Sequence, residues 1–278
     1  MNFKKLIVTK INNIATEIRL NDPDVHNALT LDIINELSLC IEELSQDTSS
    51  LILISANGKS FCAGGDLSWM KKQLSAPREN RIKEASKLAD LLLKLYNCPK
   101  TIIGKVEGNA FGGGIGIMSI CDFVFSVKDI KMALTEAKLG LIPATISPYV
   151  VRKIGEKNSI HLFTSAKIFT PEDGVKFGLI DFIYEKNEIN SKVSEFLDSF
   201  KNSAPNSILE SKKLVRDLSY PIDQNTVDLT INKLADIWDT KEAKEGISAF
   251  FNKKKPNWIK EWWWLKYQNN WPIIKSQV

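Results

Sequence analysis

The chain has 278 residues, of which 44% are hydrophobic and 25% are charged, values close to the average of soluble globular proteins. These fractions exclude intrinsically disordered, collagen-like and disulfide-scaffold proteins, and the length allows one large domain, alone or with a small one. The formal net charge of +4 is too small to indicate a nucleic acid or another polyanion as a partner.

The N-terminus and the cysteines predict a reduced, cytoplasmic protein. The apolar run Leu6–Val8 is too short for a signal peptide. The most apolar stretch, 108–127, contains Asp122 and several glycines, which argues against a membrane span. The four cysteines form no CxxC pair, and only His26 and His161 could join them, so we expect no metal site.

Strands and helices alternate through the first two hundred residues. The predicted strands cover 5–10, 13–20, 51–55, 101–108 and 122–127. The predicted helices cover a segment that begins after the N-cap Thr30, segments near 67–74 and 79–96, and a segment that ends near 120. This alternation predicts an α/β fold built from crossover units.

The pattern changes near residue 200. Beyond Ser203, three segments have the apolar spacing of amphipathic helices, with no convincing strand between them. We therefore divide the chain into an α/β core at 1–200, a helical C-terminal part at 201–258 and an extension at 259–278. Five of the seven tryptophans fall within the last 21 residues, so this extension has an unusual composition.

Two glycine-bearing loops, each between a strand and a helix, give the first chemical signal. They are Ser60–Leu67 and Gly108–Gly116. Glycine lets a ligand approach the backbone closely, and N–H groups at a helix N-terminus lack an intrahelical partner and carry partial positive charge. Two such loops could aim donors at one developing oxyanion. A dinucleotide loop is excluded, because its third glycine would fall at Ser119, and no P-loop lysine follows.

Motifs along most of the chain resemble the enoyl-CoA hydratase/isomerase (crotonase) superfamily in order and spacing. The resemblance covers roughly residues 5–258 and rests on Asn21–Thr30, Phe61–Leu67, Gly108–Gly114, Cys121–Asp122 and Glu136–Pro143. Within the superfamily, four segments are similar to those of bacterial methylglutaconyl-CoA hydratases. These segments are Asp66–Met70, Ile142–Val151, Glu245–Phe250 and Lys255–Trp258.

The resemblance implies a spiral of β-β-α units with a C-terminal helical oligomerisation region, assembled as a trimer or a dimer of trimers. It also implies an acyl-CoA thioester substrate, so coenzyme A would belong to the substrate and no separate cofactor is expected. Matched by position, the backbone N–H groups of Gly65 and Gly113 would form the oxyanion hole. The residues expected to bind the substrate and its CoA are Ala28, Ala63, Gly64, Asp66, Trp69, Met70 and Gly112.

The resemblance assigns the acid–base role to Glu136. Crotonase-type hydratases commonly use two glutamates, but Gly116 occupies the position of the first one here. Bacterial methylglutaconyl-CoA hydratases are similar in carrying glycine there, and enoyl-CoA isomerases manage with one carboxylate. Glu136 alone could take a proton from water and deliver one to the α-carbon, if burial raised its pKa toward the working pH. The alternative is that Glu136 is a salt-bridged surface residue.

Two further groups of side chains have both a functional and a structural interpretation. Trp69 and Met70 would line the acyl pocket or simply pack in the core. Four cationic residues near them could bind a carboxylate at the end of the acyl group, or remain solvated at the surface. These residues are Lys71, Lys72, Arg78 and Arg81.

Five polar residues are the remaining candidates. Thr145 and Ser147 could offer hydroxyls to the substrate or cap the helix that begins near Ser147. His26 and His161 are expected to be structural. Asp66 is expected to cap the helix that follows it rather than to exchange protons.

Three functions remain open from the sequence. The first is a hydratase acting on a branched or glutaconyl-type enoyl-CoA, with 3-methylglutaconyl-CoA of leucine degradation as the best candidate. The second is a single-glutamate enoyl-CoA isomerase or decarboxylase, and the third is a non-catalytic homologue that binds CoA esters. For the extension at 259–278, packing over a neighbouring subunit or the active-site mouth is favoured over a membrane-interface anchor.

Overall fold

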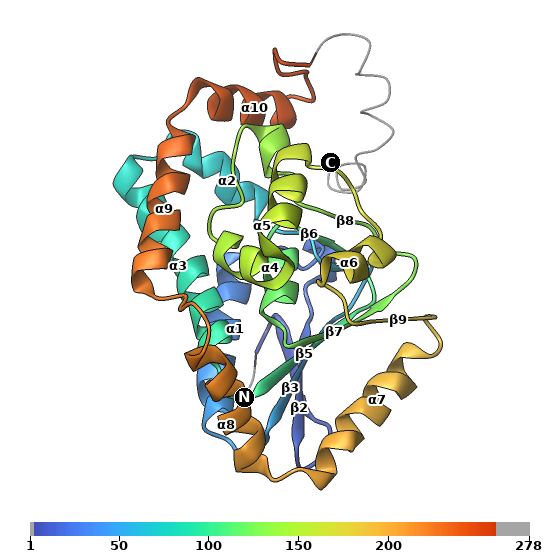
Figure 1. Cartoon of the computed structure of the whole chain (residues 1–278). Coiled ribbons are helices and arrows are strands. Elements are labelled where there is room, and N and C mark those ends of the chain that lie inside the picture. Colours follow the sequence, from blue (N-terminus) through green and yellow to red (C-terminus); the bar gives the residue numbers. More distant parts are fainter. Residues whose placement is uncertain (1–2, 260–278) are drawn as a thin grey trace.

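The computed structural model describes residues 3–259 as layers of helices around two sheets (Figure 1). The strands are β1 (Leu6–Lys10), β2 (Ala15–Leu20), β3 (Leu51–Ala56), β4 (Ser60–Cys62), β5 (Thr101–Val106), β6 (Asn109–Phe111), β7 (Phe123–Val127), β8 (Met132–Ala133) and β9 (Phe182–Tyr184). The helices are α1 (Leu31–Ser45), α2 (Leu67–Gln73), α3 (Arg78–Asn97), α4 (Gly113–Ile120), α5 (Ser147–Ser165), α6 (Pro171–Phe177), α7 (Ile189–Ser199), α8 (Pro205–Asp217), α9 (Gln224–Trp238) and α10 (Lys241–Phe251). Short 3-10 turns are η1 (Pro23–Val25), η2 (Glu136–Leu139) and η3 (Phe200–Asn202).

The larger sheet has six strands in the order β1-β2-β3-β5-β7-β9. β1 and β2 pair antiparallel, and every other neighbouring pair is parallel. The central strands β3 and β5 are buried along nearly their whole length. A parallel strand covered on both faces needs a continuous apolar run, which is why LILIS and TIIGKV could be recognised from sequence.

The smaller sheet has three parallel strands in the order β4-β6-β8. β4 and β6 lie within the two segments that were predicted to be loops, so this prediction is wrong. Strands of two or three residues are too short to show an alternating pattern. Three successive strand pairs, β3 with β4, β5 with β6 and β7 with β8, each place one strand in the larger sheet and the next in the smaller one. The expected α/β fold of β-β-α units is therefore confirmed.

The predicted boundaries in the first half hold with small shifts. Thr30 caps α1 by accepting a hydrogen bond from the backbone N–H of Ile33. The second strand begins at Ala15 instead of residue 13, because the Asn12 side chain accepts hydrogen bonds from the N–H groups of Ile14 and Ala15 and holds a turn there. The strand predicted for 101–108 ends at Val106.

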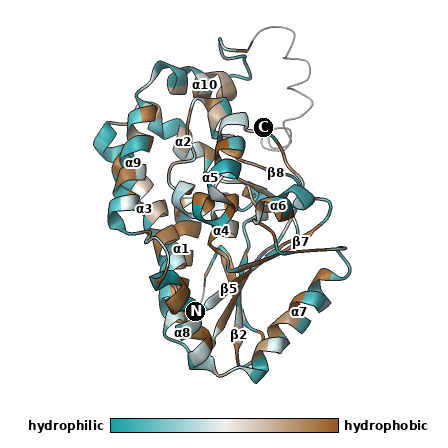
Figure 2. Ribbon diagram, viewed as in Figure 1, coloured by the Kyte–Doolittle hydropathy of each residue, from teal (hydrophilic) through white to brown (hydrophobic). Residues whose placement is uncertain are grey.

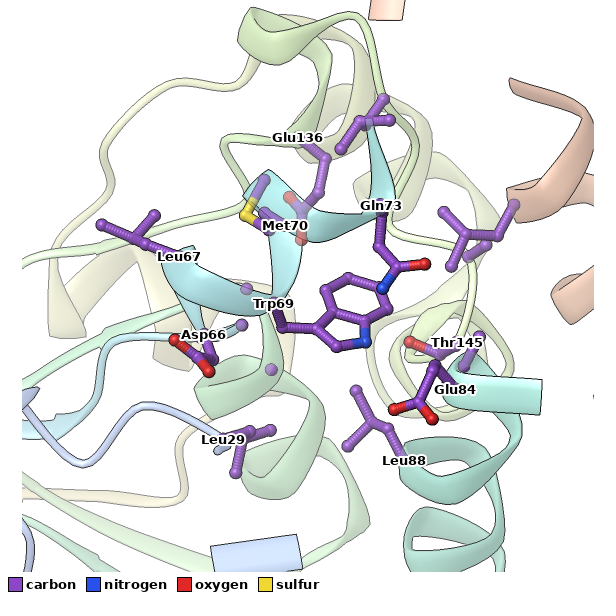
Figure 3. Close-up of a pocket in the computed structure, with 18 of the residues that line it drawn as sticks. Leu29, Asp66, Leu67, Trp69, Met70, Gln73, Glu84, Leu88, Glu136 and Thr145 are labelled. Atoms are coloured by element: carbon purple, nitrogen blue, oxygen red, sulfur yellow. The ribbon is translucent and has the colours of Figure 1, made fainter. Parts of the chain in front are cut away.

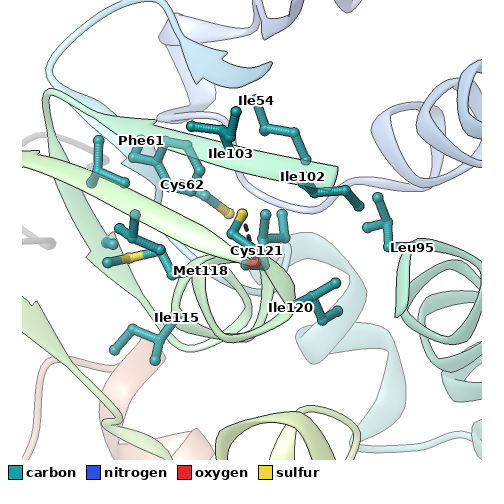
Figure 4. Packing of buried hydrophobic residues seen from close by; sticks show 14 of the residues in the cluster. Ile54, Phe61, Cys62, Leu95, Ile102, Ile103, Ile115, Met118, Ile120 and Cys121 are labelled. Atoms are coloured by element: carbon teal, nitrogen blue, oxygen red, sulfur yellow. Dashed lines mark hydrogen bonds between the residues drawn. The ribbon is translucent and has the colours of Figure 1, made fainter. Parts of the chain in front are cut away.

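Helix α4 lies at the centre of the main hydrophobic core and is buried along its whole length. Figure 4 shows its apolar side chains between the larger sheet, β4 and α3. The residues labelled there are Ile54, Phe61, Cys62, Leu95, Ile102, Ile103, Ile115, Met118, Ile120 and Cys121. In Figure 2 the hydrophobic colour concentrates on the strands and α4, while the outer helices carry hydrophilic residues on the side away from the core. This core fixes the start of α4 relative to both sheets.

The C-terminal helices return to the α/β part of the same chain. α9 packs on α3 through Val227 and Ile231 against Ala85 and Ala89. α10 packs on η2. The three amphipathic helices expected beyond residue 203 are present in the described region, with no strand between them. No helix within residues 3–259 is long and apolar enough to cross a membrane. Most of the tryptophan-rich extension, 260–278, lies outside the described residues.

Candidate active site

The three segments expected to carry the chemistry follow the three strands of the smaller sheet. β4 leads into Ala63–Asp66, β6 leads into Gly112 and Gly113, and β8 leads through Thr135 into Glu136. The strands are parallel neighbours, so their carboxyl ends lie at one edge of the sheet. Ligands of α/β proteins bind at that edge. Strand pairing therefore brings together segments that lie some 70 residues apart in the sequence.

The two glycine loops touch each other through their backbones. Gly64 has a φ of +93°, and a Cβ placed on it would lie 3.0 Å from the Phe111 carbonyl oxygen and 3.5 Å from the Gly113 nitrogen. A Cβ on Gly113 would lie 2.5 Å from Cδ1 of Leu29. The Leu29 N–H in turn donates to the Gly64 carbonyl at 2.8 Å. This close approach requires residues without side chains.

The N–H groups of Gly65 and Gly113 are available to a ligand. Gly113 is the first residue of α4, so its N–H has no intrahelical acceptor, and it lies at the positive end of the helix. Within residues 3–259 no backbone carbonyl accepts from either N–H group. Both glycines line the same cavity. Such a pair can stabilise an oxygen that gains negative charge during a reaction.

A cavity of about 660 Å³ lies over the two loops (Figure 3). This volume is typical of small-molecule sites, which span roughly 300–1,000 Å³. The expected site residues that line the cavity are Ala63, Gly64, Gly65, Asp66, Trp69, Met70, Gly112, Gly113 and Glu136. Ala28 is an exception, because it is buried and does not line the cavity, although Leu29 beside it does.

Glu136 begins the turn η2 and places its carboxylate against the second glycine loop. A Cβ on Gly112, whose φ is +46°, would lie 3.1 Å from Oε1 of Glu136. The other oxygen, Oε2, is shielded from solvent and has no hydrogen-bond partner among the described residues. This burial raises the pKa of Glu136 to about 7. The salt-bridged surface alternative is therefore wrong, and a carboxyl with this pKa can both take up and release a proton near neutral pH.

The turn that carries Glu136 is held by helix α10. A Cβ on Gly140, whose φ is +70°, would lie 2.5 Å from the Glu242 carbonyl oxygen. A Cβ on Gly246 would likewise lie 2.5 Å from the Leu139 carbonyl oxygen. Two glycines, one on each side, thus allow the backbones of η2 and α10 to meet directly. The helical C-terminal part therefore helps to position Glu136.

The space beside Gly116 is filled by an aliphatic side chain. A Cβ on Gly116 would overlap Cγ2 of Ile146 and lie 2.9 Å from its Cβ. Ile146 is itself buried at 2% exposure. A glutamate at position 116 would require Ile146 to move, so the glycine and the isoleucine form a matched pair. Of the two positions where the resemblance leads us to expect glutamates, only position 136 carries one here.

The other carboxylates that line the cavity have partners. Asp66 caps α2, as expected, by accepting from the backbone N–H of Ser68 at 2.9 Å and from its hydroxyl at 2.7 Å. Glu84 forms a 2.7 Å ion pair with Lys87. Glu136 differs from both, because its buried Oε2 has no hydrogen-bond partner among the described residues.

The four candidate cations differ in their surroundings: the two arginines form ion pairs, and one of the two lysines lines the cavity. Arg81 forms an ion pair with Asp239 at 2.5 Å, and Arg78 pairs with Asp236 at 2.6 Å. Lys71 does not line the cavity, whereas Lys72 does. Lys72 is thus the one member of the four expected cations that borders the cavity in the described structure.

The remaining polar candidates are largely structural. Thr145 lines the cavity. The Ser147 hydroxyl instead donates to the Ala144 carbonyl at 2.7 Å and does not cap α5. His26 contacts the Ser60 hydroxyl through Nδ1 at 3.3 Å, and His161 lies beside Phe177; neither lines the cavity. No group of three or more His, Cys, Asp or Glu that could hold a metal occurs in the part of the chain that the structure describes.

Several residues of the cavity wall were not expected from the sequence, among them Gln73, Lys83 and Trp238. The Trp238 ring meets the Trp69 ring edge-on, with centroids 6.1 Å apart. Gln73 is 4% exposed, and its Oε1 has no hydrogen-bond partner among the described residues. An unpaired buried carbonyl of this kind costs about 1–3 kcal/mol. Asp66, Trp69, Met70 and Gln73 share one face of α2, but this spacing alone does not indicate that Gln73 is buried.

Comparisons with known proteins agree with this geometry. The family model for enoyl-CoA hydratase/isomerase matches residues 10–261. A putative enoyl-CoA hydratase of Thermus thermophilus is 28% identical over 240 residues, which is 85% of this chain and 94% of that protein. A trans-2-decenoyl-[acyl-carrier-protein] isomerase of Streptococcus mutans is 25% identical over 92% of this chain and 98% of its own length. The crystal structure of an enoyl-CoA hydratase from Shewanella pealeana superposes with a TM-score of 0.75 at 33% identity, covering 92% of this chain and 96% of that one.

Proposed function

The chain belongs to the enoyl-CoA hydratase/isomerase family, and from this premise we propose that it is a hydratase of acyl-CoA thioesters. The observation that carries the proposal is the buried, unpartnered carboxylate oxygen of Glu136, which faces a cavity bordered by two backbone N–H donors. The enzyme would add water across a carbon–carbon double bond conjugated to the thioester, or remove it in the reverse direction.

The proposed reaction uses one carboxylate and two backbone donors. Glu136 takes a proton from water, whose oxygen bonds to the β-carbon, while the electrons of the double bond move onto the thioester oxygen. The N–H groups of Gly65 and Gly113 stabilise that oxygen, and removing one such donor typically costs about 2.7–4 kcal/mol in transition-state stabilisation. When the carbonyl reforms, Glu136 returns the proton to the α-carbon. The pKa of about 7 suits both steps.

The acyl group that we propose is 3-methylglutaconyl, as in leucine degradation. The support is a cavity with largely apolar walls and three lysines among its lining residues, Lys72, Lys83 and Lys87. Leu139, Leu141 and Trp238 form an apolar cluster beside Trp69 and Met70, which suits a branched acyl chain. Lys72 at the border could attract the terminal carboxylate. Coenzyme A would enter only as part of this substrate.

Double-bond isomerisation is the second candidate, because Glu136 is present but Gly116 stands where hydratases commonly carry a second glutamate. Ile146 fills the space beside Gly116, and a lone carboxylate suffices to move a proton between two carbons. One relative is named as an isomerase of an acyl-carrier-protein thioester. A non-catalytic CoA-ester-binding protein is a weaker candidate, since the raised pKa of Glu136 would then have no use.

Turnover of three thioesters separates these functions. The purified full chain is incubated with 3-methylglutaconyl-CoA, crotonyl-CoA and a 3-enoyl-CoA, and the products are identified by mass spectrometry. Water addition to 3-methylglutaconyl-CoA with little addition to crotonyl-CoA supports the proposal. Migration of the double bond in the 3-enoyl-CoA, without water addition to the others, would establish the isomerase. Binding of all three without turnover would overturn both enzymatic functions.

We also propose that the protein acts as a homo-oligomer, a trimer or a dimer of trimers, in the cytoplasm. The support is an apolar surface at the end of α8. Leu214, Val215, Leu218 and Tyr220 are 59%, 63%, 81% and 93% exposed. Exposed apolar side chains grouped in this way are typical of protein–protein interfaces. Light scattering of the wild type and of a Leu218→Ser/Tyr220→Ser variant tests the assignment, and an unchanged molar mass in the variant would remove this surface from the interface.

A further inference from the structure

Gln73 is the most buried residue of α2 and also the least suited to its surroundings. It is the only buried residue of the helix, while Trp69 and Met70 on the same face are half-buried. The apolar cluster beside this face contains Leu139 and Leu141. A leucine or methionine would satisfy such a position without any polar group to pair.

The side-chain amide of Gln73 has no structural task in the described protein. Its Oε1 is shielded from solvent and has no partner within residues 3–259. The Arg81 guanidinium does bond to Gln73, but it donates to the backbone carbonyl at 3.1 Å and not to the amide. Arg81 also pairs with Asp239. The hydrogen bond from Arg81 holds the end of α2 through the Gln73 backbone and leaves the amide oxygen of Gln73 unpaired.

The amide belongs to the cavity wall. Gln73 lines the same cavity as Glu136 and the glycine loops. Figure 3 shows its amide beside the Trp69 indole, on the side of the cavity away from Asp66 and toward Thr145 and Glu84. Seven residues of helix separate Asp66 from Gln73, which corresponds to about 10 Å along α2. A thioester held at the glycine loops would therefore reach Gln73 only with the far end of its acyl group.

We propose that Gln73 is a specificity residue that binds an oxygen at the far end of the acyl group, a terminal carboxylate or hydroxyl. The amide can accept from a hydroxyl through its oxygen or donate to a carboxylate through its nitrogen, because rotation about the last bond exchanges the two atoms. A plain alkyl end would leave the amide unpaired. This proposal rests on the proposed function for the position of the thioester, but it concerns binding and not turnover.

Saturated thioesters test the proposal, because they have no double bond to hydrate. Calorimetry measures the Kd of valeryl-CoA, glutaryl-CoA and 5-hydroxyvaleryl-CoA for the wild type and for Gln73→Leu. We expect Gln73→Leu to weaken glutaryl-CoA and 5-hydroxyvaleryl-CoA by about tenfold, the worth of one hydrogen bond, and to leave valeryl-CoA unchanged or tighter. The Tm of this variant should not fall, since the substitution removes an unpaired buried group.

Two further variants make the test specific. Gln73→Glu should weaken glutaryl-CoA much more than 5-hydroxyvaleryl-CoA, because a carboxylate at position 73 repels a terminal carboxylate but can accept a hydrogen bond from a hydroxyl. The lower of the two wild-type Kd values shows which terminus the site prefers. Lys71→Ala, an exposed change on the same helix, is the control and should alter no Kd. If Gln73→Leu shifts all three thioesters by the same factor, or lowers the Tm, Gln73 is a packing residue and the proposal is wrong.

The outcome also separates this proposal from the proposed function. If the wild type binds these thioesters with the expected Gln73 dependence but hydrates no enoyl-CoA, the hydratase assignment fails and the role of Gln73 stands. Hydration together with uniform Kd shifts would support the hydratase assignment and overturn the role of Gln73. If the wild type binds none of the three thioesters, both proposals are overturned.

Discussion

The two sheets of this protein differ in size and in task. The larger one has six strands, with continuous apolar runs at its centre, and contributes more residues to the main hydrophobic core than the smaller one does. The smaller one has three strands of two or three residues, and its carboxyl edge carries both glycine loops and Glu136. In each β-β-α unit, one strand thus belongs to the sheet that supplies more of the core, and the next belongs to the sheet that carries the candidate site. Substitutions in the two sheets should therefore have different signatures.

The largest effect is expected at the edge of the smaller sheet. Glu136→Gln keeps the shape of the side chain but removes its proton chemistry, so kcat/KM should fall by about 10²–10⁴-fold. The Kd of a saturated acyl-CoA should stay within a few-fold of the wild type. Glu172→Gln, an exposed change at the start of α6, is the matched control and should keep full activity. A near-normal rate for Glu136→Gln would remove Glu136 from the mechanism.

The same residue should make stability depend on pH. Burial raises the pKa of Glu136 from 4.5 to about 7, so the folded chain holds this proton more tightly than the unfolded chain. The stabilising contribution is complete below pH 4.5, falls as the pH rises and is lost above about 7, a change of up to about 3 kcal/mol. Glu136→Gln cannot lose a proton. It should therefore have a higher free energy of unfolding than the wild type at pH 8 but not at pH 4.5, as measured by urea denaturation.

The two donor glycines should respond unequally to a methyl group. A Cβ on Gly113 would lie 2.5 Å from Leu29, whereas a Cβ on Gly65 would meet no atom within 4 Å. Gly113→Ala should therefore displace its N–H and lower kcat about tenfold, part of the loss known for removing such a donor. Gly65→Ala should lower it less than about threefold. Leu29→Ala should partly rescue Gly113→Ala; equal effects of both alanines, with no rescue, would contradict the assigned contact.

The smallest effect is expected in the larger sheet. Ile52 is fully buried in β3. Ile52→Val should lower the free energy of unfolding by about 0.5–1.5 kcal/mol and leave kcat/KM within twofold of the wild type. Chemical denaturation and steady-state kinetics check both parts. A tenfold loss of kcat/KM would show that the two sheets are not separable in this way.

The same contrast explains what could be predicted from the sequence. LILIS and TIIGKV have enough consecutive apolar residues to identify β3 and β5, and the Thr30 cap marked the start of α1. The strands SFC and NAF have no length over which a period could be seen. The glycine loops and Glu136 were found through a resemblance and not through periodicity, and the structure places them on one cavity.

Other parts of the site depend on contacts that no local pattern contains. Whether Glu136 is a surface residue or a buried acid depends on β8 and on α10, which lies about 100 residues further along the chain. Ile146 could not be linked to Gly116 without coordinates. Gln73 lies in a stretch, LSWMKKQ, in which three polar residues in succession favour a solvated surface. Its burial comes from packing against later elements.

The direct contact between η2 and α10 has a consequence for the order in which the protein is made. The chain leaves the ribosome from its N-terminus, and earlier parts of a chain can begin to fold before later ones exist. Both sheets are complete once β9 has emerged, but the backbone that seats the Glu136 turn arrives only with Lys241–Phe251. A nascent chain that lacks α10 could therefore have both sheets folded and still be unable to catalyse the proposed hydration. Activity should begin only after α10 has been synthesised and docked.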